Sequence, residues 1–123
     1  MDFIFDDKLP IYTQIMNYIK KKIILGELCG GDKLPSVREL SSELKVNPNT
    51  IQRSYQELER EGLTYTQRGT GTFVTENKDT IFTLKKDMAK EVIDRFLREM
   101  KDLGFKGEDI INIVSEETNK EEE

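Results

Sequence analysis

The sequence has 123 residues, a hydrophobic fraction of 36%, a charged fraction of 35% and a formal net charge of −5. This suits one domain, or a small domain with a helical extension, and no apolar run approaches the roughly 18 residues of a membrane span. Because there is no histidine and only one cysteine, Cys29, a Ser-His-Asp triad, a Cys-His pair, a histidine-rich metal site and an internal disulfide are excluded. The single cysteine favours a cytoplasmic protein. A paired-carboxylate enzyme stays open, but no spacing of the acids singles out a pair, so we expect no enzyme and no cofactor.

The charges are unevenly distributed along the chain. Acidic and basic residues balance over residues 1–75, so the whole acidic excess arises in residues 76–123. A neutral N-terminal part is less basic than a nucleic-acid-binding domain usually is. Such a function would therefore depend on where individual charges point.

An amphipathic helix is predicted over residues 11–25. Apolar side chains recur there every four residues and so share one face, at Ile11, Ile15, Ile19 and Ile23. Pro10 suits the start of this helix and Gly26 its end. The later "LPS", residues 34–36, predicts a short extended segment, because the residue before a proline avoids the helical region.

Two further helices and a hairpin are predicted next. Ser36 and Glu39 have the spacing of a capping box that opens a second helix, and Asn47 followed by Pro48 suits the start of a third, over about residues 48–61. After Gly62 the apolar period changes from 3.6 to 2, which predicts two short strands joined by the turn "RGTG". The fold class is therefore mainly α with a small β-hairpin: a winged helix-turn-helix domain over residues 1–75.

The C-terminal part is predicted to be helical. Residues 76–80 are a predicted polar linker. A helix is predicted over about residues 81–103, and a short helix at 108–114. The longer helix has an apolar stripe at Leu84, Met88, Val92, Phe96 and Met100. Two such helices cannot bury this surface by themselves, so residues 81–115 are expected to form a dimerisation or effector region. Packing back onto the N-terminal domain of the same chain is the alternative. Residues 116–123 are a predicted disordered acidic tail.

The third helix has two distinct faces at about 100° per residue. Its core face holds Ile51, Tyr55 and Leu58, and its forward face carries no acid: Asn49, Gln52, Arg53, Gln56 and Arg60. Asn and Gln side chains can pair with adenine, and Arg with guanine. Taken alone, the helix is equally consistent with a face that contacts only water.

Two longer motifs carry a resemblance to a known family. The chain from Pro10 to Val74, with "LPSVREL" and "RGTGTFV", resembles the N-terminal winged helix of the GntR family of bacterial transcription regulators. "VNPNT" and the short C-terminal part resemble its small YtrA-like branch. The resemblance implies a sequence-specific transcriptional regulator, usually a repressor, that binds a pseudo-palindromic operator in double-stranded DNA as a homodimer through residues 81–115.

The resemblance also implies the residues that contact DNA. They lie on the second helix, at the start of the third helix and in the wing: Arg38; Asn47, Asn49, Thr50, Gln52 and Arg53; and Arg68, Gly69 and Thr70. The family's larger effector domains have no counterpart here, so the existence of a small-molecule effector stays open. A winged helix used only for protein contacts would show an apolar or acidic forward face. The family version fused to an aminotransferase-like domain is not expected, because too few residues follow the wing.

Overall fold

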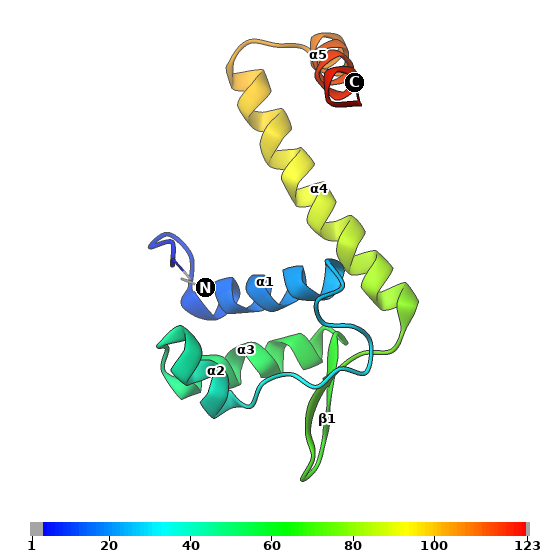
Figure 1. The fold of residues 1–123 in the computed structure, drawn as a ribbon. Helices are drawn as coiled ribbons and strands as arrows, with labels where there is room; N and C mark the ends of the chain where they lie inside the picture. The colour runs from blue at the N-terminus through cyan, green and yellow to red at the C-terminus, as the bar shows by residue number, and fades with distance from the viewer. Residues whose placement is uncertain (1–3, 123) are drawn as a thin grey trace. The chain divides into compact units, whose positions relative to one another are not determined.

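The computed structural model describes residues 4–122. Its elements follow the order α1 (Ile11–Ile24), α2 (Val37–Leu44), α3 (Pro48–Arg60), β1 (Thr64–Gln67), β2 (Gly71–Val74), α4 (Lys78–Asp102) and α5 (Gly107–Glu122) (Figure 1). The packing divides the chain after Lys85 into two compact units. The predicted winged helix-turn-helix with a helical C-terminal extension is confirmed.

The core of the first unit lies between α3 and the two helices that precede it. From α1, Ile15, Ile19 and Ile23 are buried. The predicted core face of α3 is confirmed, because Ile51, Tyr55 and Leu58 are all buried. Ser54 of α3 is also fully buried, at 0% exposure, which the apolar pattern alone did not predict.

The wing is an antiparallel hairpin attached to the body at its base. Strands β1 and β2 pair from Thr64–Val74 to Gln67–Gly71. The predicted extended segment before α2 lies beside β2, through an isolated bridge between Lys33 and Phe73 and a hydrogen bond from the Leu34 N–H to the Thr72 carbonyl at 2.8 Å. These bonds fix the hairpin to the segment that leads into α2.

The predicted linker at residues 76–80 is wrong for residues 78–80, which are helical, whereas residues 76 and 77 have no regular secondary structure. Helix α4 begins at Lys78, three residues before the predicted start, and ends at Asp102. The Asn77 side chain accepts hydrogen bonds from the Asp79 and Thr80 amides, at 2.9 and 3.2 Å, and so caps the helix. The polar composition of this segment therefore marks a helix start. The first unit also includes the start of α4 as far as Lys85, and Leu84 in this part is buried at 7% exposure.

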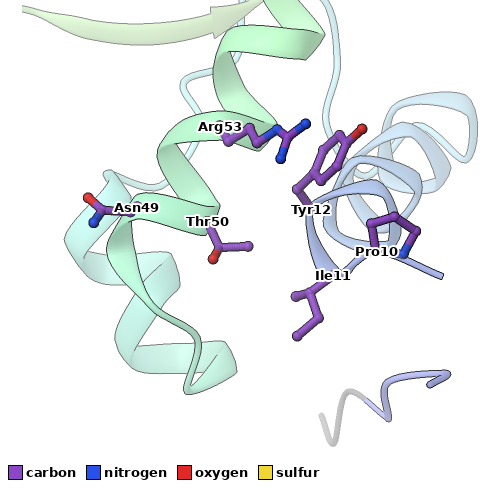
Figure 2. Close-up of a pocket in the computed structure, with 6 residues that line it drawn as sticks. All are labelled: Pro10, Ile11, Tyr12, Asn49, Thr50 and Arg53. Atoms are coloured by element: carbon purple, nitrogen blue, oxygen red, sulfur yellow. The ribbon is translucent and has the colours of Figure 1, made fainter. Parts of the chain in front are cut away.

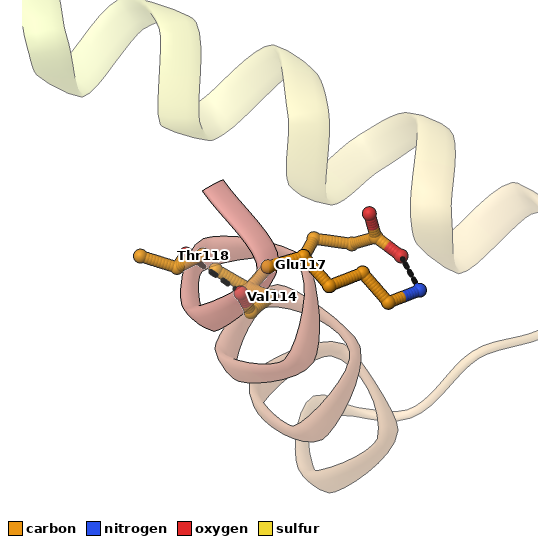
Figure 3. Close-up of polar contacts among 4 residues, drawn as sticks. Val114, Glu117 and Thr118 are labelled. Carbon is orange, nitrogen blue, oxygen red and sulfur yellow. Dashed lines mark hydrogen bonds and ion pairs between the residues drawn. The ribbon is translucent and has the colours of Figure 1, made fainter. Parts of the chain in front are cut away.

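The predicted disordered tail is also wrong for residues 116–122, which continue α5 to Glu122; Glu123 lies outside the described residues. The side chains in this part interact along the helix axis. Lys120 pairs with Glu117 at 3.4 Å, and the Thr118 hydroxyl donates to the Val114 carbonyl at 2.7 Å (Figure 3). Charged pairs at this spacing favour helix, and the net charge of the segment does not reveal them.

Replacing Leu58 by Ala should test the core face of α3. Leu58 is fully buried, so the change should lower the free energy of unfolding by about 2–5 kcal/mol, through lost burial and the cavity left behind. Urea unfolding followed by circular dichroism would measure this. The exposed Gln56 on the same helix supplies the control, and Gln56→Ala should change stability by less than about 0.5 kcal/mol. Equal effects of the two changes would contradict the assigned faces.

Candidate nucleic-acid interface

The start of α3 is fixed by its own turn. The Asn47 side-chain oxygen accepts from the Asn49 amide at 2.8 Å, as predicted for an N-cap. In the preceding turn, Lys45 adopts the left-handed conformation, with φ 57°, and the Ser41 hydroxyl donates to the Val46 carbonyl at 2.6 Å. The first turn of α3 therefore has a defined position relative to α2.

The forward face of α3 is exposed. Asn49, Gln52 and Arg53, with Gln56 and Arg60 further along, are all exposed to solvent, as the helical pattern predicted. Arg60 forms an ion pair with Glu57 at 3.1 Å, so its charge is partly balanced. Near the helix start, Asn49, Gln52 and Arg53 face outward. They lie beside the backbone amides of the first turn, and such amides favour the binding of an anion.

Arg53 and Thr50 face a depression between the starts of α1 and α3. This depression has a volume of about 560 Å³ and is lined by Pro10, Ile11, Tyr12, Asn49, Thr50 and Arg53. The Arg53 guanidinium carbon lies 3.8 Å from the centroid of the Tyr12 ring, and Thr50 is half-buried (Figure 2). Residues of α1 thus border the candidate interface, which no motif in the sequence indicated.

Arg38 is presented by the first turn of α2. The predicted capping box is present: the Glu39 amide donates to the Ser36 hydroxyl at 3.0 Å, and the Ser36 amide donates to the Glu39 carboxylate at 3.1 Å. The hydrogen bond from the Ser36 amide lowers the pKa of Glu39 below its ordinary value of 4.5. Arg38 is exposed next to this fixed turn.

The wing brings Arg68, Gly69 and Thr70 to the tip of the hairpin, where all three are exposed. Gly69 has φ +79°, a conformation that favours glycine. A depression of about 410 Å³ lies between the wing and the start of α2. Lys33 borders it, and its aliphatic chain lies close to Gly71. Lys33 was missed from the sequence, because only the long-range bridge between Lys33 and Phe73 brings it beside the wing.

The structure therefore places every predicted contact residue in the first unit, on α2, at the start of α3 or at the wing tip. All are exposed except the half-buried Thr50. Within residues 4–122, no cluster of three acidic, histidine or cysteine side chains could hold a metal, and no helix is long and apolar enough to cross a membrane.

A helix presented beside a capped second helix and a hairpin wing defines the class: a winged helix-turn-helix regulator. The chain belongs to the gntR family of bacterial regulatory proteins, whose family model matches residues 11–74. The relatives described next are named as transcription regulators.

Two curated relatives come from Bacillus subtilis. The HTH-type transcriptional regulator YhcF is 46% identical over 111 residues, which cover 90% of this chain and 92% of YhcF. The HTH-type transcriptional repressor YtrA is 46% identical over 89 residues, which cover 72% of this chain and 68% of YtrA. The resemblance to the YtrA-like branch is therefore confirmed.

Two solved structures are also similar. A GntR family transcriptional regulator from Listeria monocytogenes has a TM-score of 0.84 and 50% identity, covering 91% of this chain and 98% of that chain. The DNA-binding domain of AraR, in complex with operator ORX1, has a TM-score of 0.54 and 30% identity, covering 61% of this chain and 92% of that chain. The protein is thus a DNA-binding transcriptional regulator of this family.

Replacing Ser36 by Ala should test the capping box that carries Arg38. The change removes the acceptor of the Glu39 amide and should lower the free energy of unfolding by about 0.5–2 kcal/mol. Ser42→Ala, at an exposed position within α2, is the control and should have no destabilising effect. Urea unfolding at pH 7 would measure both variants, and equal stabilities would show that the capping box contributes little.

The contribution of Glu39 should also depend on pH. Because the folded-state pKa of Glu39 lies below its ordinary value of 4.5, its stabilising effect is complete above that value and is lost as the pH falls through the lower, folded-state pKa. The difference in stability between the protein and its Glu39→Gln variant should therefore shrink as the pH falls below 4.5. A difference that stays constant down to pH 2 would contradict this.

Proposed function

We propose that the protein is a cytoplasmic repressor that binds a pseudo-palindromic operator as a homodimer. The observation that carries this proposal is the exposed, acid-free forward face of α3, flanked by Arg38 and by the wing. The AraR domain, which is similar in fold and sequence, was solved on an operator. This supports operator DNA as the partner of this chain.

The contacts divide by the chemistry of their side chains. Asn49 and Gln52, on the exposed start of α3, would enter the major groove, where their amides match the edge of adenine. Arg38 and Arg68 would contact phosphates on either side, and the wing tip with Gly69 and Thr70 would approach the minor groove. Asn47 would act through its cap, because its side-chain oxygen is already bonded to the Asn49 amide.

Replacing Arg38 or Arg68 by Ala should weaken operator binding between about fivefold and a hundredfold. Both side chains are exposed, so the melting temperature should stay within about 2 °C. Lys21→Ala removes one positive charge from an exposed position on α1 and serves as the control for net charge. Fluorescence anisotropy with a duplex from the promoter of the protein's own operon would measure the affinities. A matching loss of folding would show that these arginines are structural.

The salt dependence of binding tests whether phosphates are contacted despite the balanced charge of this unit. Each phosphate contact should add about 0.9 to the slope of log affinity against log salt concentration. The wild-type protein should therefore lose affinity steeply between about 50 and 200 mM salt. A flat dependence would count against the proposed function.

The second unit supplies the surface for dimerisation. Val92 of α4 is 55% exposed, and Ile111 of α5 is 66% exposed. These side chains line a groove of about 580 Å³ between α4 and α5, together with Phe96 and Val114. Exposed apolar surface of this kind marks an interaction site, and a second copy of the chain offers the same surface. This supports the expectation that residues 81–115 hold two copies together.

Replacing Ile111 by Asp should raise the dissociation constant of the dimer by about tenfold or more, because a carboxylate would be buried without a partner. Asn112→Asp, at an exposed polar position on the same helix, makes the same charge change and should leave the dimer intact. Analytical ultracentrifugation over a range of concentrations would measure both. A wild-type protein that stays monomeric would favour the alternative, in which this surface packs within one chain.

A further inference from the structure

The Arg53 side chain is held against a second helix. Its guanidinium carbon lies 3.8 Å from the centroid of the Tyr12 ring on α1, which is within the range of a cation–π contact. Because the guanidinium is planar, a ring on one face leaves the N–H groups at its edge able to donate. Arg53 therefore keeps its charge and its donors while its position is restricted.

Tyr12 is itself fixed by the residue that follows Arg53. The Ser54 hydroxyl lies 3.0 Å from the Tyr12 carbonyl and 3.0 Å from the Thr50 carbonyl, and Ser54 is 0% exposed. This hydroxyl links the backbone of α1 at Tyr12 to α3. The Tyr12 ring and the Arg53 guanidinium thus extend from two helices whose backbones are linked by the Ser54 hydroxyl.

The direction of Arg53 differs from that of Asn49. The Arg53 and Thr50 side chains point toward α1, whereas the Asn49 side chain extends from the other side of α3, although Asn49 also borders the depression (Figure 2). A helical wheel places Asn49 and Arg53 only about 40° apart, but the long Arg53 side chain bends toward the Tyr12 ring. A guanidinium held beside a neighbouring helix is better placed for the phosphates at the edge of a DNA groove than for the base pairs at its bottom.

We propose that Tyr12 is a positioning residue that holds the Arg53 guanidinium for a backbone phosphate of the DNA. This inference rests on the proposed function and adds α1 to the surface that contacts DNA. An arginine that is already stacked has less rotamer freedom to lose on binding, so the contact forms at a lower entropic cost. Asn49, on the other side of α3, is left to contact bases.

The experiment begins by selecting a tight-binding duplex from a random pool with the wild-type protein. Affinity for that duplex is then measured at several salt concentrations for Tyr12→Leu, Tyr12→Phe, Arg53→Ala and the double variant Tyr12→Leu/Arg53→Ala. Tyr12→Leu removes the ring and should weaken binding by about twofold to fivefold, whereas Tyr12→Phe keeps the ring and should bind as the wild type does.

Arg53→Ala should lower the salt slope by about 0.9, the value of one phosphate contact. In the Arg53→Ala background, Tyr12→Leu should have no further effect, because the two residues act as one unit. The control is Tyr18→Leu on the same helix, where Lys22 lies 5.0 Å from the ring centroid; it should leave binding unchanged. Nuclear magnetic resonance of the free protein gives a readout independent of DNA, since Tyr12→Leu should remove the ring-current shift of the Arg53 side-chain N–H.

Independent, additive losses from Tyr12→Leu and Arg53→Ala would overturn the positioning role. An unchanged salt slope for Arg53→Ala, with altered preference at one base pair, would overturn the phosphate assignment, because that is the behaviour of a base contact. An Arg53 side-chain resonance that is the same in the wild type and in Tyr12→Leu would show that the stack does not form. Failure of the wild-type protein to enrich any duplex would instead defeat the proposed function, and this inference with it.

Discussion

The position of α3 depends on two adjacent hydroxyl groups buried against its neighbours. Ser54 bonds to the backbone of α1 at Tyr12, and Tyr55 donates to the Pro35 carbonyl at 2.7 Å, just before α2 begins. Burial raises the pKa of Tyr55, so this hydroxyl keeps its proton. Because a buried polar group is costly when it lacks a partner, these two bonds favour one arrangement of the three helices over its alternatives.

The remaining parts of the interface follow from that arrangement. The end of α3 carries Glu59, whose carboxylate accepts from the Thr66 amide of β1 at 2.9 Å. The strand of the wing is therefore joined to the same helix that presents Asn49 and Arg53. The segment before α2 is bonded both to Tyr55 and to Thr72 of the wing. One helix thus determines the relative positions of Arg38, the forward face and the wing tip.

Local sequence signals were sufficient for much of this architecture. The capping box at Ser36, the N-cap at Asn47 and the change of period after Gly62 all involve residues a few positions apart. The start of α2, the start of α3 and the hairpin each lie where these signals predicted them. The helical wheel likewise separated Ile51 and Leu58 from the exposed residues of α3. These features depend on backbone geometry within one or two helical turns, so the spacing of residues in the sequence is enough to predict them.

Contacts between distant segments could not be predicted in this way. The link between Ser54 and Tyr12 spans 42 positions, and the proximity of Lys33 to the wing depends on its bridge to Phe73. Neither leaves a periodic signal. The start of α4 and the end of α5 differ from the prediction for another reason. Polar composition usually favours irregular structure, whereas here Asn77 and the Lys120–Glu117 pair use polar groups to stabilise helix.

The same structure accounts for how a neutral unit can face a polyanion. Several of its acids are engaged in local structure: Asp32 and Glu39 accept from backbone amides, and Glu61 pairs with Lys20 at 2.9 Å. Arg53 instead rests on a neutral ring, which attracts the guanidinium but does not cancel its charge. Net charge therefore understates the positive potential near Arg53. Asp32, Glu39 and Glu61 are bonded to backbone amides or to a lysine, while the stacked Arg53 keeps its charge at the surface.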